Sequence, residues 1–254
     1  MLSSNHYGVP EVRRRVIIIG NNQNAQNHFP AKEYANINEA NSKLKKCRTV
    51  GWAFNNLIYH GQNAHNHDEN DGKIKNSLEE QRIKHIKEGC SIRYERDEKA
   101  YLPKRLWFDH GIDENGKKIT WEDISEKRFR EAKLARLDRN KPSPTILTSK
   151  TVHYHPTKNR YLTVREAAAL QSFPPDFIFK GTLSNQWTQI GNAVPPLMAE
   201  ALGKSIIQTH KNKSIKIPAQ KNIDFDAVAS YAFKYDKDTF EHSSKLLQQM
   251  PLEI

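Results

Sequence analysis

The chain has 254 residues, enough for one or two domains, and its net charge of +11 with a pI of about 9.5 favours a polyanionic partner such as nucleic acid. Charge alone leaves a lysine-rich surface without such a partner equally open. No apolar run has the length of a membrane span or of a signal peptide, and the only two cysteines lack C-x-x-C spacing, so we expect no metal, no disulfide scaffold and a bacterial-type cytoplasmic location.

The first predicted element is a strand at Val16–Ile19. Four consecutive β-branched residues lie between a turn at Tyr7–Pro10 and Gly20, a pattern typical of a strand buried on both faces. Such a strand needs neighbours, and the next strand candidates lie far downstream, where none forms a β-α-β series with it. The sequence therefore predicts part of a sheet rather than a whole one.

Residues 21–158 are mostly polar and carry weaker signals. Residues 21–45 predict a loop with a short helix near Ile37–Leu44, and residues 60–76 predict a second loop. Histidine, asparagine and aspartate in that second loop are common turn formers, so a solvated or base-contacting loop is favoured over a zinc site. The other expected elements are a helix at Ser77–Glu88 that Gly89 ends, charged strands and loops over residues 93–141, and a short strand at Thr145–Thr148.

Two later helices are predicted from their start signals. Thr163 and Glu166 have the spacing of a capping box ahead of an apolar helical face, and Pro174 begins a proline pair that stops this helix. A second helix is expected to begin at the proline pair Pro195–Pro196, because proline is tolerated in the first turn, and to run to about Ile207.

Three sequence blocks carry a family resemblance. They are Tyr7–Gly20 with its Arg-x-Arg turn, Arg160–Phe179, and Gln189–Pro196 with the sequence Gln-Ile-Gly-Asn-Ala-Val-Pro-Pro. In this order, with a long variable basic insert before the second, they resemble the last blocks of DNA cytosine-5 methyltransferases of the bacterial restriction-modification type. Pro142–Ile146 resembles a short threonine–aliphatic element of that family's recognition region. Glu11 departs from the family pattern, which has glutamine there.

The resemblance implies an α/β fragment. It would comprise the last strand or strands and the C-terminal helix of a Rossmann-like methyltransferase domain that uses S-adenosylmethionine, together with a mixed α+β target-recognition domain. The implied divisions are a catalytic-domain fragment at 1–45, the recognition domain at 46–180, a return segment and helix at 181–210, and a tail at 211–254.

The family's nucleophile block and most of its cofactor blocks have no match. There is no Phe-x-Gly-x-Gly loop and no Glu-Asn-Val block, and neither Cys47 nor Cys90 follows a proline as the family's nucleophile does. We therefore expect a second polypeptide to bring the nucleophile and the glycine loop, and to share S-adenosylmethionine and double-stranded DNA with this chain. An inactive DNA-binding remnant and a regulatory protein that caps an intact methylase remain alternatives.

The matched blocks imply roles for particular residues. Arg13 and Arg15 are expected to be catalytic, acting beside the flipped cytosine, with Arg14 solvated. The residues expected to line the cofactor are Asn192, Ala193 and Val194, although the asparagine would also suit a helix-entry turn.

Structural and DNA-reading roles complete the expectations. Thr163, Arg165, Glu166 and Gly191 are expected to be structural, the first three by capping a helix and tying it to the recognition domain. Sequence readout is expected from residues 46–158, where most cations would contact phosphates and a few would read base edges. By their position after Thr145–Ile146, the candidates for DNA contact are Lys150, Thr151, His153 and Tyr154.

Overall fold

A computed structural model describes residues 1–22, 26–39, 43–55, 57–59, 62–63, 65–92, 95–120 and 135–211. The contacts within the chain divide it into two units. One unit contains residues 1–17 and 31–201, and the other contains residues 18–30 and 202–254. Residues 1–17, 31–45 and 181–201, which the resemblance assigns to catalytic-domain fragments, lie in one unit with the predicted recognition region. The tail after Lys211 lies outside the described residues.

The strands are short and form three separate pairs. They are β1 (Leu2–Ser3) antiparallel to β2 (Arg14–Arg15), β3 (Ile58–Tyr59) antiparallel to β4 (Gln62–Asn63), and β5 (Ala135–Arg136) parallel to β6 (His153–Tyr154). The described residues therefore contain α and β structure but no sheet larger than two strands. A doubly wound parallel sheet is not formed within this part of the chain.

The strand predicted at Val16–Ile19 is wrong for this structure. No strand is assigned there, and the side chains of Val16 and Ile18 are 69% and 90% exposed instead of buried. The physical reason is that burial of a strand depends on its neighbours. The described residues offer this segment no strand to pair with, although its β-branched composition remains suited to a sheet interior.

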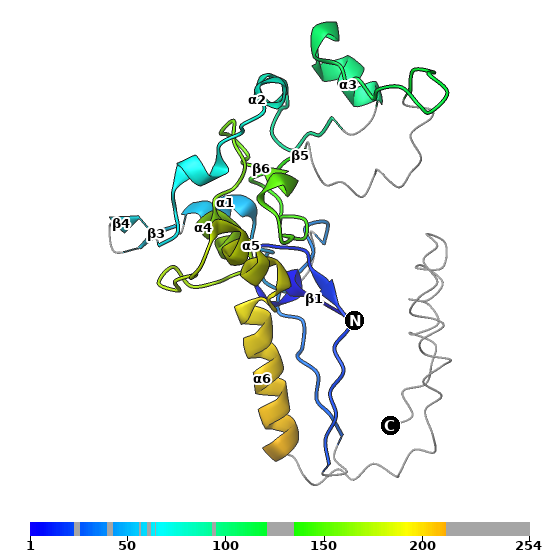
Figure 1. Ribbon diagram of the computed structural model, residues 1–254. Helices are drawn as coiled ribbons and strands as arrows, with labels where there is room; N and C mark the ends of the chain where they lie inside the picture. Colours follow the sequence, from blue (N-terminus) through cyan, green and yellow to red (C-terminus); the bar gives the residue numbers. More distant parts are fainter. Residues whose placement is uncertain are drawn as a thin grey trace. The chain divides into compact units, whose positions relative to one another are not determined.

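Six α-helices lie in the described residues (Figure 1). They are α1 (Val50–Asn55), α2 (Ser77–Ile83), α3 (Glu95–Tyr101), α4 (Val164–Leu170), α5 (Leu183–Asn192) and α6 (Pro196–Lys211). The predicted starts of α2, α4 and α6 are confirmed. The helices α1, α3 and α5 were not predicted, and α3 lies in a segment where only strands and loops were expected. Two expected elements are not found: the described residues of the segment Ile37–Leu44 show no helix, and Thr145–Thr148 is not assigned as a strand.

The start of α4 is fixed by local hydrogen bonds. The Thr163 side chain accepts the backbone N–H of Glu166, and the Glu166 carboxylate accepts the backbone N–H of Thr163 at 2.8 Å. These two bonds satisfy donors that have no partner within a helix, so the predicted capping box is confirmed.

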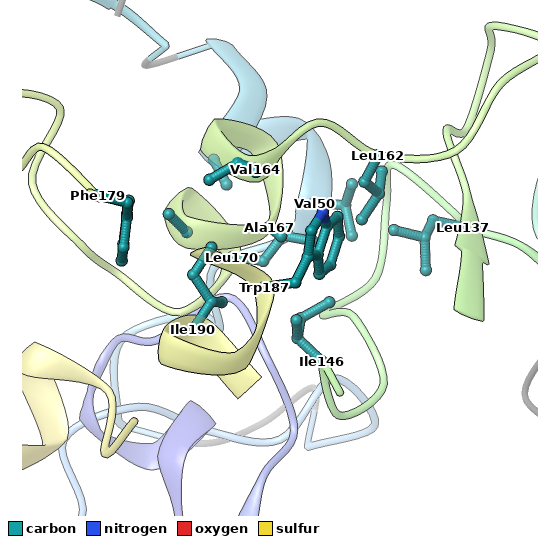
Figure 2. Close-up of a cluster of buried hydrophobic side chains, with 12 residues drawn as sticks. Val50, Leu137, Ile146, Leu162, Val164, Ala167, Leu170, Phe179, Trp187 and Ile190 are labelled. Carbon is teal, nitrogen blue, oxygen red and sulfur yellow. The ribbon is translucent and has the colours of Figure 1, made fainter. Parts of the chain in front are cut away.

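Two apolar clusters form the core of the larger unit. In the first, Trp187 of α5 lies against α4 and α1, and Ile146 and Leu137 approach it from other segments (Figure 2). The second cluster joins α2 to the segments around Leu106 and Tyr154. The first cluster brings the helix of the second motif block and the helix of the third block together, and both frame the site described next.

Candidate functional site

The arginine turn runs beside the predicted threonine–aliphatic element. The backbone N–H of Val12 donates to the carbonyl of Ser143 at 2.8 Å, and the N–H of Ser143 donates to the carbonyl of Pro10 at 2.9 Å. The Thr145 hydroxyl adds a bond to the Val12 carbonyl at 3.0 Å. Two segments more than 130 residues apart in sequence are thus held side by side by their backbones.

Arg13 is buried at the centre of this junction. Its Nη1 donates to the carbonyl of Ile146 at 3.0 Å, and its Nη2 donates to the carbonyl of Gly191 at 2.6 Å. Burial lowers the pKa of the guanidinium, although an arginine stays charged well above neutral pH. One side chain therefore joins the arginine turn, the Ile146 element and the C-terminal end of α5, which lie far apart in the sequence.

Glu11 is buried in the same junction. Its Oε1 accepts the backbone N–H of Ile146 at 2.6 Å and lies 3.9 Å from Nη1 of Arg13, while its Oε2 is buried without a hydrogen bond in the described structure. Burial raises the pKa of this carboxyl to about 7, despite the opposing effects of the Ile146 N–H and of Arg13. The sequence marked this residue only as a departure from a family pattern and gave no sign of its burial.

The two arginines that follow are exposed. Both belong to β2, where Arg15 pairs with Leu2 of β1, and Nη1 of Arg15 donates to the carbonyl of Arg14 at 2.9 Å. The expectation that Arg14 is solvated agrees with its exposure, but exposure alone does not separate it from Arg15. Arg15 lies two residues beyond the anchored Arg13, so its backbone is held within roughly 7 Å of that anchor.

Gly191 occupies a position where any side chain would collide with a neighbouring backbone. A Cβ at this position would lie 2.5 Å from the backbone nitrogen of Thr148 and 2.7 Å from its Cα. The Gln171 side chain also binds the carbonyl of the preceding Ile190, at 2.7 Å. Because the backbones of α5 and Thr148 lie so close together, only a glycine can occupy position 191. The same contact fixes the position of the residues that follow Gly191.

The three predicted cofactor residues form the link between α5 and α6. Asn192 is the last residue of α5 and is exposed, Ala193 has extended backbone geometry, and Val194 is 48% exposed. Asn192 ends one helix rather than beginning the next, because α6 starts at Pro196. An amide beside an uncovered isopropyl group suits a ligand such as S-adenosylmethionine, which has both polar and apolar parts, so these residues can serve as one wall of its site.

The predicted DNA-reading residues divide into two groups. Lys150 and Thr151 are partly exposed, with the lysine Nζ donating to the carbonyl of Asp71 at 2.8 Å. His153 and Tyr154 are buried in β6, and the Tyr154 hydroxyl donates to the Glu79 carboxylate at 2.6 Å. The prediction that His153 and Tyr154 contact DNA is therefore corrected, because their side chains pack inside the recognition region.

Arg165 and Glu166 of α4 are also buried. Arg165 donates to the backbone carbonyls of His65 at 2.7 Å, Pro174 at 2.9 Å and Phe177. Burial alone would raise the pKa of Glu166, but two hydrogen bonds from Arg160, at 2.7 and 2.8 Å, hold that pKa below its usual value. The guanidinium of Arg165 thus joins the distant loop at His65 to the segment after α4 and does not face solvent.

Arg136 was missed by sequence reasoning. This buried residue of β5 donates to the carbonyls of Ile83, Ile86, His155 and Lys158 and to the side chain of Asn159. It therefore joins α2 to the turn after β6 through carbonyl and amide oxygens. No sequence signal separates it from the many other cations of the insert, since its partners are backbone groups up to 53 residues away.

Other kinds of site find little support in the described residues. No group of three or more histidine, cysteine, aspartate or glutamate side chains there is placed to hold a metal ion. The two cysteines are not joined in a disulfide. No helix in the same part of the chain is long and apolar enough to span a membrane.

Comparison with known proteins identifies the family. A family model described as C-5 cytosine-specific DNA methylase matches residues 1–208. The chain belongs to this family. Type II methyltransferase M1.HphI of Haemophilus parahaemolyticus is 30% identical over 213 residues, which cover 84% of this chain and 48% of that relative. Type II methyltransferase M.NgoFVII of Neisseria gonorrhoeae is 31% identical over 221 residues, covering 85% of this chain and 51% of the relative.

A third relative matches a shorter stretch. Type II methyltransferase M.AquIB of Picosynechococcus sp. is 47% identical over 83 residues, which cover 28% of this chain and 60% of the relative. The chain thus spans about half the length of M1.HphI and M.NgoFVII, and the matched stretch of M.AquIB is a larger share of a smaller protein.

Proposed function

We propose that this chain is the target-recognition and C-terminal part of a DNA (cytosine-5) methyltransferase of a restriction-modification system, acting on DNA in the bacterial cytoplasm. A second polypeptide would carry the nucleophilic cysteine and the glycine loop. The observation that carries the proposal is the pair of hydrogen bonds from Arg13 to Ile146 and Gly191, which joins the first and third family blocks to the Pro142–Ile146 element in one junction.

Arg15 is proposed as the catalytic arginine, and Arg13 as the residue that positions it. Nη1 and Nη2 of Arg13 each donate to a backbone carbonyl, whereas Arg15 is exposed on the strand that follows. A fixed positive charge there can hydrogen-bond a flipped cytosine and stabilise negative charge that develops on its ring. Moving the cytosine out of the duplex costs a few kcal/mol of lost base stacking, and the binding contacts between protein and DNA must offset this cost.

Asn192, Ala193 and Val194 are proposed as one wall of the cofactor site. S-adenosylmethionine, when bound, supplies the methyl group that replaces the C5 proton of cytosine. The Asn192 amide would donate to or accept from its polar groups, and Val194 would cover an apolar part. Because Gly191 is bonded to Arg13, this wall and Arg15 are anchored to the same buried guanidinium, which supports a shared site.

The recognition region, proposed at residues 46–180, would grip and read the duplex. The net charge of +11 favours phosphate contacts, and Lys150 and Thr151 remain the proposed contacts near the Ile146 element. Residues 1–45 and 181–210 are proposed to be fragments of the catalytic domain.

Three observations support the second polypeptide. M1.HphI and M.NgoFVII carry about as much sequence again beyond the part that this chain matches. In addition, the 83 matched residues are 60% of M.AquIB, so that relative is shorter than this chain. A protein named as a methyltransferase can therefore be as small as one part of the family's full length. Cys47 and Cys90 follow lysine and glycine, not proline, and so do not match the family's nucleophile.

Arg15→Ala tests the assigned role. In a complex of this chain with the polypeptide that carries the nucleophile, the variant is expected to lower turnover on the order of 10²-fold and to change DNA affinity by less than about threefold. Arg14→Ala is the matched control, since it removes the neighbouring exposed arginine, and should leave turnover within about threefold. An equal loss of turnover and affinity in Arg15→Ala would make it a positioning contact to DNA.

A further inference from the structure

Gly8, Tyr34 and Trp52 surround Arg48 and form an arginine cage in the larger unit. The Cζ atom of the Arg48 guanidinium lies 4.1 Å from the centre of the Trp52 ring and 5.5 Å from the centre of the Tyr34 ring. Its Nη1 donates to the carbonyl of Gly8 at 3.2 Å. The charge is attracted by the faces of both rings. The guanidinium is therefore held in one orientation, although the residue is only half-buried.

Three segments of the chain build this cage, and backbone hydrogen bonds fix them. The N–H of Tyr34 donates to the carbonyl of His6 at 3.0 Å, and the N–H of Ala35 donates to the carbonyl of Lys45 at 2.8 Å. A Cβ at Gly8 would lie 2.9 Å from two carbon atoms of the Tyr34 ring, so this ring lies directly on the glycine. The arginine is therefore supported by fixed backbone on more than one side.

Helix α1 places Trp52 at the surface. Val50 and Ala53 of this helix are buried, and Figure 2 shows Val50 directed into the first apolar cluster. Trp52 lies between them in sequence, and 41% of it is exposed. Aromatic and cationic side chains placed together in this way are common on surfaces that bind nucleic acid.

The positive charge of Arg48 is not neutralised within the described part of the chain. No carboxylate there pairs with it, and its Nε and Nη2 have no hydrogen-bond partner among the described residues. Cations on neighbouring segments differ, since Lys45 pairs with Glu33 at 3.2 Å and Arg139 pairs with Glu88 at 2.9 Å. Nε and Nη2 lie on one edge of the planar guanidinium, so both can donate to two oxygens of a single anion. The cage is therefore a preformed site for an anionic group.

Backbone bonds connect the cage to the junction that Arg13 forms. The carbonyl of Pro10, in the turn that contains the glycine of the cage, accepts the N–H of Ser143 at 2.9 Å. The N–H of Val50, at the start of α1, donates to the carbonyl of Lys141 at 2.9 Å. Both contacts reach the segment that leads into the threonine–aliphatic element. An anion bound by the cage would therefore be held by the same unit as the proposed catalytic arginine.

We propose that Arg48 binds a backbone phosphate of the DNA duplex and that Tyr34 and Trp52 position its guanidinium. A phosphodiester has two free oxygens, which suit the open edge of this group. An arginine supported close to the protein surface has a short reach, so it suits the outer phosphates of a duplex better than base edges within a groove. Lys46, which is exposed, adds a second cation two residues away.

The choice of DNA as the source of the anion rests on the proposed function. The chain belongs to a family of DNA methylases, and its net charge of +11 favours a polyanion over a small anion. A phosphate fixed beside the junction would hold the duplex in register with the site proposed for the flipped cytosine. Arg48 would thus be a positioning residue and not a catalytic one.

The salt dependence of DNA binding tests this assignment. The full-length chain is titrated into a labelled duplex of mixed sequence, and fluorescence anisotropy gives the affinity at several salt concentrations. Arg48→Gln removes the charge and keeps a planar amide that can stack on the rings. Each neutralised phosphate contributes roughly 0.9 to the slope of log K against log salt concentration, so the slope should become shallower by about that amount. The affinity at low salt should fall about tenfold.

Two further variants separate charge from structure. Arg48→Lys keeps the charge and loses the planar fork, so it should lower the affinity and keep the slope. Lys32→Gln is the matched control, because Lys32 is already paired with Glu39 at 2.8 Å, and it should change neither quantity. If Arg48 only connects Gly8 to α1, Arg48→Gln would lower the midpoint of thermal unfolding and leave the slope unchanged. That result would overturn the proposal.

Inorganic phosphate distinguishes a DNA phosphate from a free anion. Adding it should shift the midpoint of thermal unfolding equally in the wild type and in Arg48→Gln. A stabilisation that Arg48→Gln removes, with no change in the slope for DNA, would assign the cage to a free anion and contradict the proposal. Absence of duplex binding by the wild-type chain would contradict it as well.

Failure of this inference can be told apart from failure of the proposed function. If the complex with the nucleophile-bearing polypeptide methylates DNA but Arg48→Gln keeps the wild-type slope, only the phosphate site is wrong. If the slope becomes shallower and the complex transfers no methyl group, the phosphate site holds and the proposed function fails.

Discussion

Replacing Glu11 with glutamine is expected to change how the stability of this protein depends on pH. The carboxyl is buried, its Oε2 makes no hydrogen bond in the described structure, and its nearest cation is Arg13, at 3.9 Å. Burial raises its pKa from 4.5 to about 7. Glutamine keeps an oxygen that can accept the Ile146 N–H, but it does not ionise, and it is the residue that the family pattern has at this position.

The sign follows from proton binding. In the unfolded chain Glu11 loses its proton near pH 4.5, and in the folded chain near pH 7. Between these values the folded state holds more protons, so raising the pH favours unfolding. A shift of this size corresponds to roughly 3 kcal/mol. The free energy of unfolding contributed by this site is therefore greatest below pH 4.5 and falls by that amount as the pH rises through 7.

The assay is urea unfolding followed by circular dichroism, on the full chain, at intervals from pH 4.5 to pH 8.5. Glu11→Gln is expected to match the wild type at the acid end and to be more stable by roughly 3 kcal/mol above pH 8. Glu33→Gln serves as the control, because this exposed carboxylate forms an ion pair with the exposed Lys45 and its replacement should leave the pH profile unchanged. A Glu11→Gln profile parallel to that of the wild type would refute the reasoning.

Two further predictions concern packing and buried hydrogen bonds. Gly191→Ala should lower the free energy of unfolding by more than ~3 kcal/mol, because its methyl group would meet the Thr148 backbone at 2.5 Å. Gly203→Ala, where a methyl group meets nothing, should raise it by up to about 1 kcal/mol, and thermal unfolding compares the two. Arg165→Lys should cost about 3 kcal/mol in the same measurement, because a lysine cannot serve all three buried carbonyls. The exposed Arg139→Lys should cost less than ~1 kcal/mol, and equal losses would contradict the assigned role of Arg165.

Local signals in the sequence were sufficient for some elements. Thr163 and Glu166 predict the start of α4 because both partners of the capping box lie within one helical turn. Pro196 predicts the start of α6 for a similar reason, since a fixed backbone angle acts at the residue itself. The helix α5 escaped prediction, because Gly191 near its end was interpreted as part of a turn.

Features that depend on distant partners could not be predicted. Nothing in the sequence separates the buried Arg13 from the exposed Arg15, because the carbonyls that hold Arg13 lie 133 and 178 residues away. Tyr154 was placed at a DNA contact by its position in the chain, and its burial depends on Glu79, 75 residues earlier. The strand prediction at Val16–Ile19 failed for the same reason, since composition suits a sheet but cannot supply one.

The central claim is that this chain contributes DNA recognition and one wall of the methyl-donor site, while the attacking sulfur comes from another polypeptide. The most direct measurement is the transfer of labelled methyl groups from S-adenosylmethionine to duplex DNA by the purified chain, alone and mixed with the polypeptide that carries the Pro-Cys nucleophile. The account predicts no transfer by either protein alone and methylation of cytosine by the mixture. Methylation by this chain alone would contradict it.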